Sequence, residues 1–162
     1  MTTQPNTKEM ADYFKLGLRL GLLDQSPVII WADALIHAQE KPDISIIELS
    51  LSGGRSLNDT IACLGNIKGE ANTDTAIKLT LAHLWREVKT GRMSLDAASV
   101  ILYRLKDLAT AQSDVIDKIC TLDENLSLAE DGVYGSIEEA LNEIRDYLKE
   151  QQGYEMFLPE EV

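Results

Sequence analysis

The spacing of apolar residues is the feature that most constrains the fold of this chain. Over most of its 162 residues, apolar side chains recur three and four positions apart, which is the pattern of helices that each bury one face. Most of these segments begin after a capping residue, and short loops separate them. We therefore predict an all-α fold, a single-domain multi-helix bundle of about seven to eight helices. A solenoid-like stack of helical hairpins is the alternative arrangement.

The predicted helices follow one another along the whole chain. We place them at residues 8–22, 27–39, 44–52, 57–67, 74–90, 95–109, 113–130 and 137–151. The segment 44–52 also alternates as a strand does, but no second strand offers it a partner, so a helix is favoured. One helical domain then covers residues 1–162, with flexible or irregular tails at 1–6 and 153–162.

Two of these helices carry distinct terminal or packing signals. Asn6 followed by Glu9 has the spacing of a capping box at the start of the first helix. Ser26 followed by Pro27 suits the start of the second. The apolar residues of this second helix cover nearly its whole circumference, so we predict that it is central. The cysteines, Cys63 and Cys120, fall within apolar helical patterns and are expected to be reduced and buried.

Negative charge is concentrated in the last third of the chain. Residues 1–113 contain 13 acids and 12 bases, a net charge of −1, whereas residues 114–162 contain 14 acids and 3 bases, a net charge of −11. Such a surface repels nucleic acid and anionic lipid and attracts basic partners. No apolar run approaches the length of a membrane span, and the first residues do not resemble a signal peptide. We therefore expect a cytoplasmic protein that binds neither nucleic acid nor membrane.

The search for catalytic chemistry finds no motif. The two histidines, His37 and His83, belong to no metal-binding spacing, and no phosphate-binding glycine loop or nucleophile elbow is present. We expect no cofactor, no metal and no catalytic residue, and so no enzyme. If a cryptic active site exists, its best candidates are Asp33, Glu48 and His37.

The last predicted helix carries a row of acids opposite its apolar stripe. The stripe is formed by Ile137, Leu141, Ile144 and Leu148. Like charges one turn apart destabilise a helix by about 0.2–0.5 kcal/mol per pair, and such local rules tend to be broken at functional sites. The row of acids can therefore be interpreted as a docking surface for a basic protein. The competing interpretation is an acidic face that only contacts solvent. The candidate partner-binding residues are Glu138, Glu139, Glu143, Asp146, Glu150, Asp123 and Glu124.

Two segments carry a family resemblance. Residues 16–52 read LGLRLGLLDQSPVIIWADALI and, after a proline, IIELSLS, and residues 134–139 read YGSIEE. Together they resemble a group of small uncharacterised bacterial all-helical proteins, some of which look like immunity proteins of polymorphic toxin systems. The resemblance covers about a third of the chain, implies a helical bacterial protein that acts by binding another protein, and carries over no catalytic residue. Immunity proteins against nucleases are often acidic, because they cover a basic nucleic-acid cleft.

The leading hypothesis combines the charge with the resemblance. It is a non-enzymatic immunity-type protein that neutralises a basic partner, such as a cognate toxin, by occlusion with its acidic C-terminal surface. The alternative is a helical adaptor or a homo-oligomeric assembly protein that associates through apolar helix faces.

Overall fold

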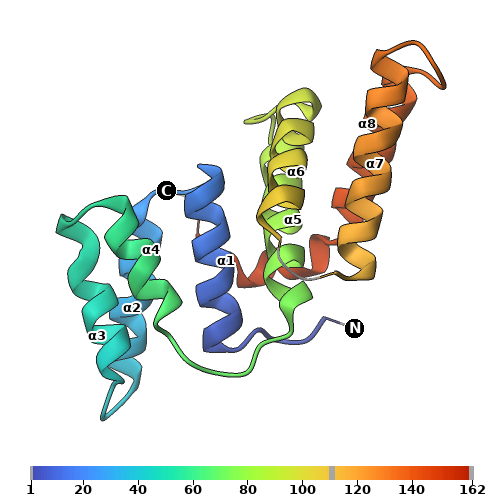
Figure 1. The fold of residues 1–162 in the computed structure, drawn as a ribbon. Coiled ribbons are helices and arrows are strands. Elements are labelled where there is room, and N and C mark those ends of the chain that lie inside the picture. Colours follow the sequence, from blue (N-terminus) through green and yellow to red (C-terminus); the bar gives the residue numbers. More distant parts are fainter. Residues whose placement is uncertain (1, 110–111, 161–162) are drawn as a thin grey trace. The chain divides into compact units, whose positions relative to one another are not determined.

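The fold is entirely helical in the part of the chain that the structure describes. The structure is a computed structural model that describes residues 2–109 and 112–160. These residues form α1 (Thr7–Leu20), α2 (Gln25–Ala38), α3 (Ile44–Ser50), α4 (Leu57–Gly65), α5 (Thr73–Lys89), α6 (Leu95–Leu108), α7 (Asp114–Glu130) and α8 (Ile137–Glu150), with 3-10 helices η1 (Leu51–Gly54) and η2 (Gln152–Phe157) (Figure 1). No strand occurs among them. The predicted all-α class is confirmed, and so is the choice of helix for Ile44–Ser50.

Two compact units divide the chain. The N-terminal unit is built from Thr3–Ala76 and the C-terminal unit from Ile77–Leu158. In the N-terminal unit α1 packs against α4 and α2 against α3, and in the C-terminal unit α6, α7 and α8 pack against one another. The prediction of one domain over residues 1–162 stays a prediction.

The start of α1 is fixed by the predicted capping box. The Asn6 side chain accepts a hydrogen bond from the Glu9 backbone N–H at 2.9 Å, and the Glu9 carboxylate accepts one from the Asn6 N–H at 3.0 Å. The second carboxylate oxygen of Glu9 accepts the N–H of Asn72 at 3.0 Å. One side chain thus caps α1 and ties it to the segment before α5.

Helix α2 differs from its prediction in two respects. Its N-cap is Asp24 and not Ser26, because the Asp24 carboxylate accepts the Ser26 N–H at 2.9 Å and the helix begins at Gln25. It buries only Val28 and Ala32, and Ile30 is 63% exposed, so the predicted central position is wrong. The longest run of buried residues lies instead in α5, where Leu79–Leu84 are all buried.

The C-terminal unit has its core between α6 and the α7–α8 pair. Figure 1 shows α7 and α8 side by side, which agrees with their packing contacts. The buried residues of these helices include Ala98, Leu102, Leu105, Ile119, Leu122, Leu126, Ala140, Ile144, Tyr147 and Leu148. Helix α8 therefore buries a face that is rotated from the predicted stripe, with Ala140 and Tyr147 in place of Ile137 and Leu141. Ile137 is 46% exposed.

Two smaller predictions also change. Residues 153–157 of the expected irregular tail belong to η2, and the following Leu158 is buried. Both cysteines are free, as expected, but both are half-buried, so the expected full burial is wrong. Of the helices in the described residues, none combines the length and the apolar character needed to cross a membrane.

Candidate partner-binding surface

An acidic stripe runs along α8. It consists of Glu139, Glu143, Asp146 and Glu150, all exposed. A helix advances about 100° per residue, so spacings of four, three and four keep these side chains within about 60° of one another. Ala140 and Tyr147 form one edge of the buried face of α8. Glu143 lies next to this edge on the helix surface. The stripe therefore borders the α7 side of α8 and does not face directly away from the core.

Counter-charges within the fold do little to neutralise this stripe. Asp146 pairs with the neighbouring Arg145 at 3.5 Å between two exposed side chains, a geometry that is worth little in water. Glu143 accepts a hydrogen bond from the Asn125 amide of α7 at 3.4 Å. Glu139 and Glu150 form no ion pair with any residue that the structure describes.

Capping explains part of the charge at the start of α8. Ser136 is the N-cap and accepts the Glu139 N–H at 3.1 Å. Glu138 and Glu139 lie in the first turn, where the helix macrodipole favours negative charge. Ser136 and Glu139 have the spacing of a capping box, and of its two hydrogen bonds the structure gives this one. Glu139 also lines a surface pocket.

This pocket, here called the tip pocket, lies where α7 meets the start of α8. Its volume is about 300 Å³. Two acids of the acidic stripe contribute to its wall, together with one aromatic residue and small residues. The lining residues are Asn125, Tyr134, Gly135, Ser136, Glu139, Ala140 and Glu143. The pocket can accept a positively charged group because both of its charged residues are acids.

Exposed apolar side chains occur in the loop before α8 and at the start of α8, close in sequence to the residues that line the tip pocket. Val133 is 69% exposed and Tyr134 is 74% exposed, and with Ile137 they form what we call the tip cluster. Gly132 and Gly135 bracket the first two residues, with φ of 69° and 73°. Sequence reasoning missed Val133 and Tyr134 as binding candidates, although two large apolar residues between glycines in a loop are a readable signal.

Of the two predicted site residues on α7, Asp123 lies apart from the acidic stripe. Asp123 accepts a hydrogen bond from Lys106 of α6 at 2.9 Å, and this bond raises the pKa of Lys106. The same ammonium lies 4.5 Å from the centre of the Tyr103 ring. Glu124 is exposed. Asn125 contacts Glu143 of the stripe, and it lies about 160° around α7 from Asp123. Asp123 therefore faces α6 and not α8.

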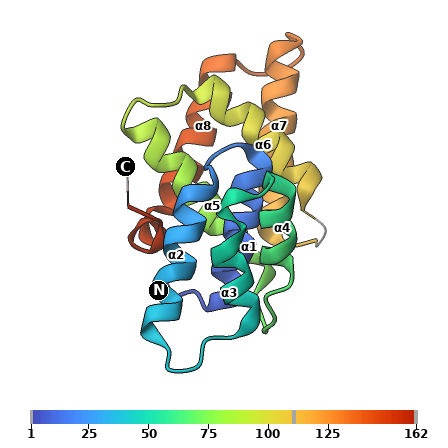
Figure 2. The same cartoon turned by 90° about the vertical axis from the view of Figure 1, so that its left-hand side faces the viewer.

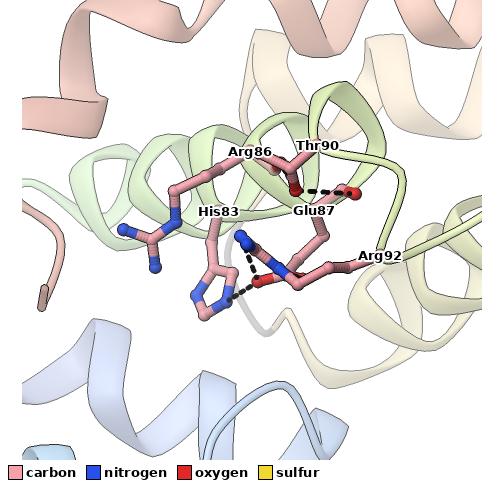
Figure 3. A network of polar contacts seen from close by, with 5 residues as sticks. All are labelled: His83, Arg86, Glu87, Thr90 and Arg92. Carbon is pink, nitrogen blue, oxygen red and sulfur yellow. Dashed lines mark hydrogen bonds and ion pairs between the residues drawn. The ribbon is translucent and has the colours of Figure 1, made fainter. Parts of the chain in front are cut away.

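A network of polar contacts lies at the C-terminal end of α5 and in the residues that follow this helix (Figure 3). The His83 imidazole lies 3.4 Å from the Glu87 carboxylate, and Arg92 donates to the same carboxylate at 2.7 Å. Burial and the positive charge of Arg86 lower the pKa of His83 to about 4. His83 is buried and therefore neutral at pH 7, whereas Arg92 of the same network is exposed.

The three candidates for a cryptic active site lie on α2 and α3. Asp33 and His37 on α2 and Glu48 on α3 are all exposed. Asp33 accepts a hydrogen bond from the Ser50 hydroxyl. Within the described residues no group of three or more His, Cys, Asp or Glu side chains is placed to hold a metal ion.

Comparisons with known proteins give no relative. The chain matches no protein-family model, no curated protein and no solved structure.

Proposed function

We propose that this chain is a non-enzymatic, immunity-type protein that binds a basic partner protein, such as a toxin, through the acidic surface of its C-terminal unit. The observation that carries the proposal is the acidic stripe of α8. Four exposed carboxylates follow one side of a helix, and the one ion pair that the described residues give this stripe, that of Asp146, is solvent-exposed.

The physical role of such a stripe is to guide association. Unneutralised surface charge raises the rate at which an oppositely charged partner arrives and fixes its register, while salt weakens the effect. A partner with a basic active cleft would be occluded when the stripe covers it. Inhibition then needs no chemistry from this chain.

Capture of a partner at two salt concentrations tests the proposal. The tagged chain should retain a basic protein from a lysate of its source organism at low salt and release it at high salt. Glu139→Lys combined with Glu143→Lys should slow association with that protein at least tenfold at low salt, by about the factor that electrostatic steering supplies.

A matched control separates the stripe from net charge. Glu40→Lys combined with Glu70→Lys makes the same change in charge at two exposed positions of the N-terminal unit. These substitutions should have a much smaller effect on the association rate. Equal slowing by both pairs, or no slowing by either, would refute the role of the acidic stripe.

A second candidate function, homo-oligomeric assembly or an adaptor role, is favoured by the exposed apolar residues of the N-terminal unit. Ile44, Ile47 and Leu51 follow one another at spacings of three and four on the side of α3 and η1 away from the buried Ile46 and Leu49. Figure 2 shows α3 beside α2. An exposed apolar row of this kind suits association that salt does not weaken.

A further inference from the structure

The tip cluster is an apolar surface that the proposed function does not yet use. We propose that Val133, Tyr134 and Ile137, with the tip pocket beside them, anchor the partner through an arginine-bearing basic segment. This inference rests on the proposed function, because it names the partner's chemistry at that surface. The acidic stripe would then govern the rate of association, and the tip cluster would supply most of the affinity.

Hydrogen bonds within the chain hold the backbone of the loop that carries Val133 and Tyr134. The N–H groups of Val133 and Tyr134 both donate to the Leu128 carbonyl, at 2.9 and 3.3 Å, so the loop is fastened to the end of α7. Large apolar side chains on a fixed loop lose little conformational entropy when they are buried against a partner. Aromatic residues in such positions are common anchors of protein interfaces.

Charge around the tip identifies the partner as basic. Residues 130–144 contain five acids and no lysine or arginine. Two of these acids, Glu130 and Asp131, stand at the C-terminal end of α7, where the macrodipole favours bases, and the last turn of α7 contains none. The helix macrodipoles therefore do not explain all of the negative charge at the tip. Binding of a positively charged segment at the tip would explain it.

Arginine fits the tip pocket better than lysine does. Glu139 and Glu143 are one turn apart on α8, which places their Cβ atoms about 5–6 Å from each other. A planar guanidinium can donate to these carboxylates while it stacks on an aromatic ring such as Tyr134, and an ammonium acts only as a point charge. The Asn125 amide, which donates to Glu143, also lines the tip pocket.

Titration of the full chain with two short peptides tests this assignment by NMR. The probes are acetyl-Gly-Arg-Gly-amide and its lysine counterpart. We expect the arginine peptide to cause saturable shifts of the Tyr134, Gly135 and Ser136 amides, at lower concentrations than the lysine peptide requires. Tyr134→Ala should lower the affinity for the arginine peptide roughly twofold to fivefold, which corresponds to an exposed cation–π contact. Tyr134→Phe should leave this affinity unchanged.

A paired variant shows whether the pocket or the general charge is responsible. Glu139→Gln with Glu143→Gln should abolish the saturable shifts, whereas Asp146→Asn with Glu150→Gln, which removes the same charge farther along the stripe, should retain them. All of these positions are exposed. Unchanged circular dichroism of each variant would confirm folding. Shifts spread along the whole stripe without saturation, or equal affinity for both peptides, would overturn the inference.

The captured partner separates this inference from the proposed function. If a basic protein is captured but Tyr134→Ala leaves its affinity unchanged, the tip cluster is not the anchor, although the function stands. If the arginine peptide occupies the pocket but no basic protein is captured, the proposed function fails while the site remains.

Discussion

At the scale of single residues, His83 makes the stability of the fold depend on pH. Its pKa falls from 6.5 to about 4 in the folded chain because of burial and of the neighbouring Arg86. The unfolded chain takes up this proton near pH 6.5, whereas the folded chain does so near pH 4. The contribution of neutral His83 is therefore complete above pH 6.5 and is lost as the pH falls toward 4.

Substitution of His83 isolates this dependence. Between pH 7 and pH 4 the wild-type chain should lose on the order of 3 kcal/mol more free energy of unfolding than His83→Gln does. Urea denaturation across this range measures the difference. His37→Gln is the control, because His37 is exposed, and its profile should follow that of the wild type. Parallel profiles for wild type and His83→Gln would contradict the prediction.

Glu9 stabilises the fold in its charged form. Burial raises its pKa, but hydrogen bonds from the Asn6 N–H, the Thr75 side chain and the Asn72 N–H together bring it below the ordinary 4.5. Glu9→Gln turns an amide N–H group toward one of these donors and removes the charge. The free energy of unfolding at pH 7 should fall by about 1.5–3 kcal/mol.

Measurements at low pH, and a control variant on the same helix, test the role of Glu9. The difference between wild type and Glu9→Gln should shrink as the pH falls below the ordinary glutamate pKa, because the unfolded chain then takes up a proton before the folded carboxylate does. Asp12→Asn breaks only the part-exposed pair with Lys8 and should cost less than about 0.5 kcal/mol. A similar loss for both variants would argue against a special role for Glu9.

At the scale of elements, the N-cap of α8 also supports the candidate surface. Ser136 satisfies the Glu139 N–H and lines the tip pocket. Ser136→Ala should lower the free energy of unfolding by about 0.5–2 kcal/mol and should broaden the NMR signals of Tyr134 and Gly135. Ser127→Ala, at an exposed position within α7, should be close to neutral by chemical denaturation. An effect of Ser127→Ala equal to that of Ser136→Ala would rule out capping as the cause.

Over the whole molecule, a net charge of −12 makes copies of the chain repel one another. Salt at 1 M shortens the range of this repulsion to about 3 Å, so the exposed apolar row of α3 and η1 becomes free to associate. The mass from light scattering should therefore rise with salt for the wild type and should rise less for Leu51→Lys. A rise that is identical in the two proteins would exclude this apolar row, and with it the second candidate function in its homo-oligomeric form.

Local signals were sufficient to predict most of the elements. The capping box of Asn6 and Glu9 and the helical spacing of Ile44–Ser50 both appear in the structure, because caps and periodicity depend on residues close together in the chain. The start of α2 was misplaced because Asp24 and Ser26 are both good N-caps two positions apart. The acidic stripe was also read from spacing alone, since a helix places residues four apart on one side.

Local sequence patterns are enough to predict the helical class, most helix positions, the acidic stripe and the concentration of negative charge near the C-terminus. Packing between helices selects which apolar residues are buried: α2 is apolar all round yet exposes Ile30, while Leu79–Leu84 of α5 are wholly buried. It also placed Asp123 against Lys106 and brought Tyr134 to a pocket beside Glu139 and Glu143. The reason is physical, because periodicity reports only the faces of one helix, whereas burial and charge pairing depend on the neighbour that the packed chain supplies.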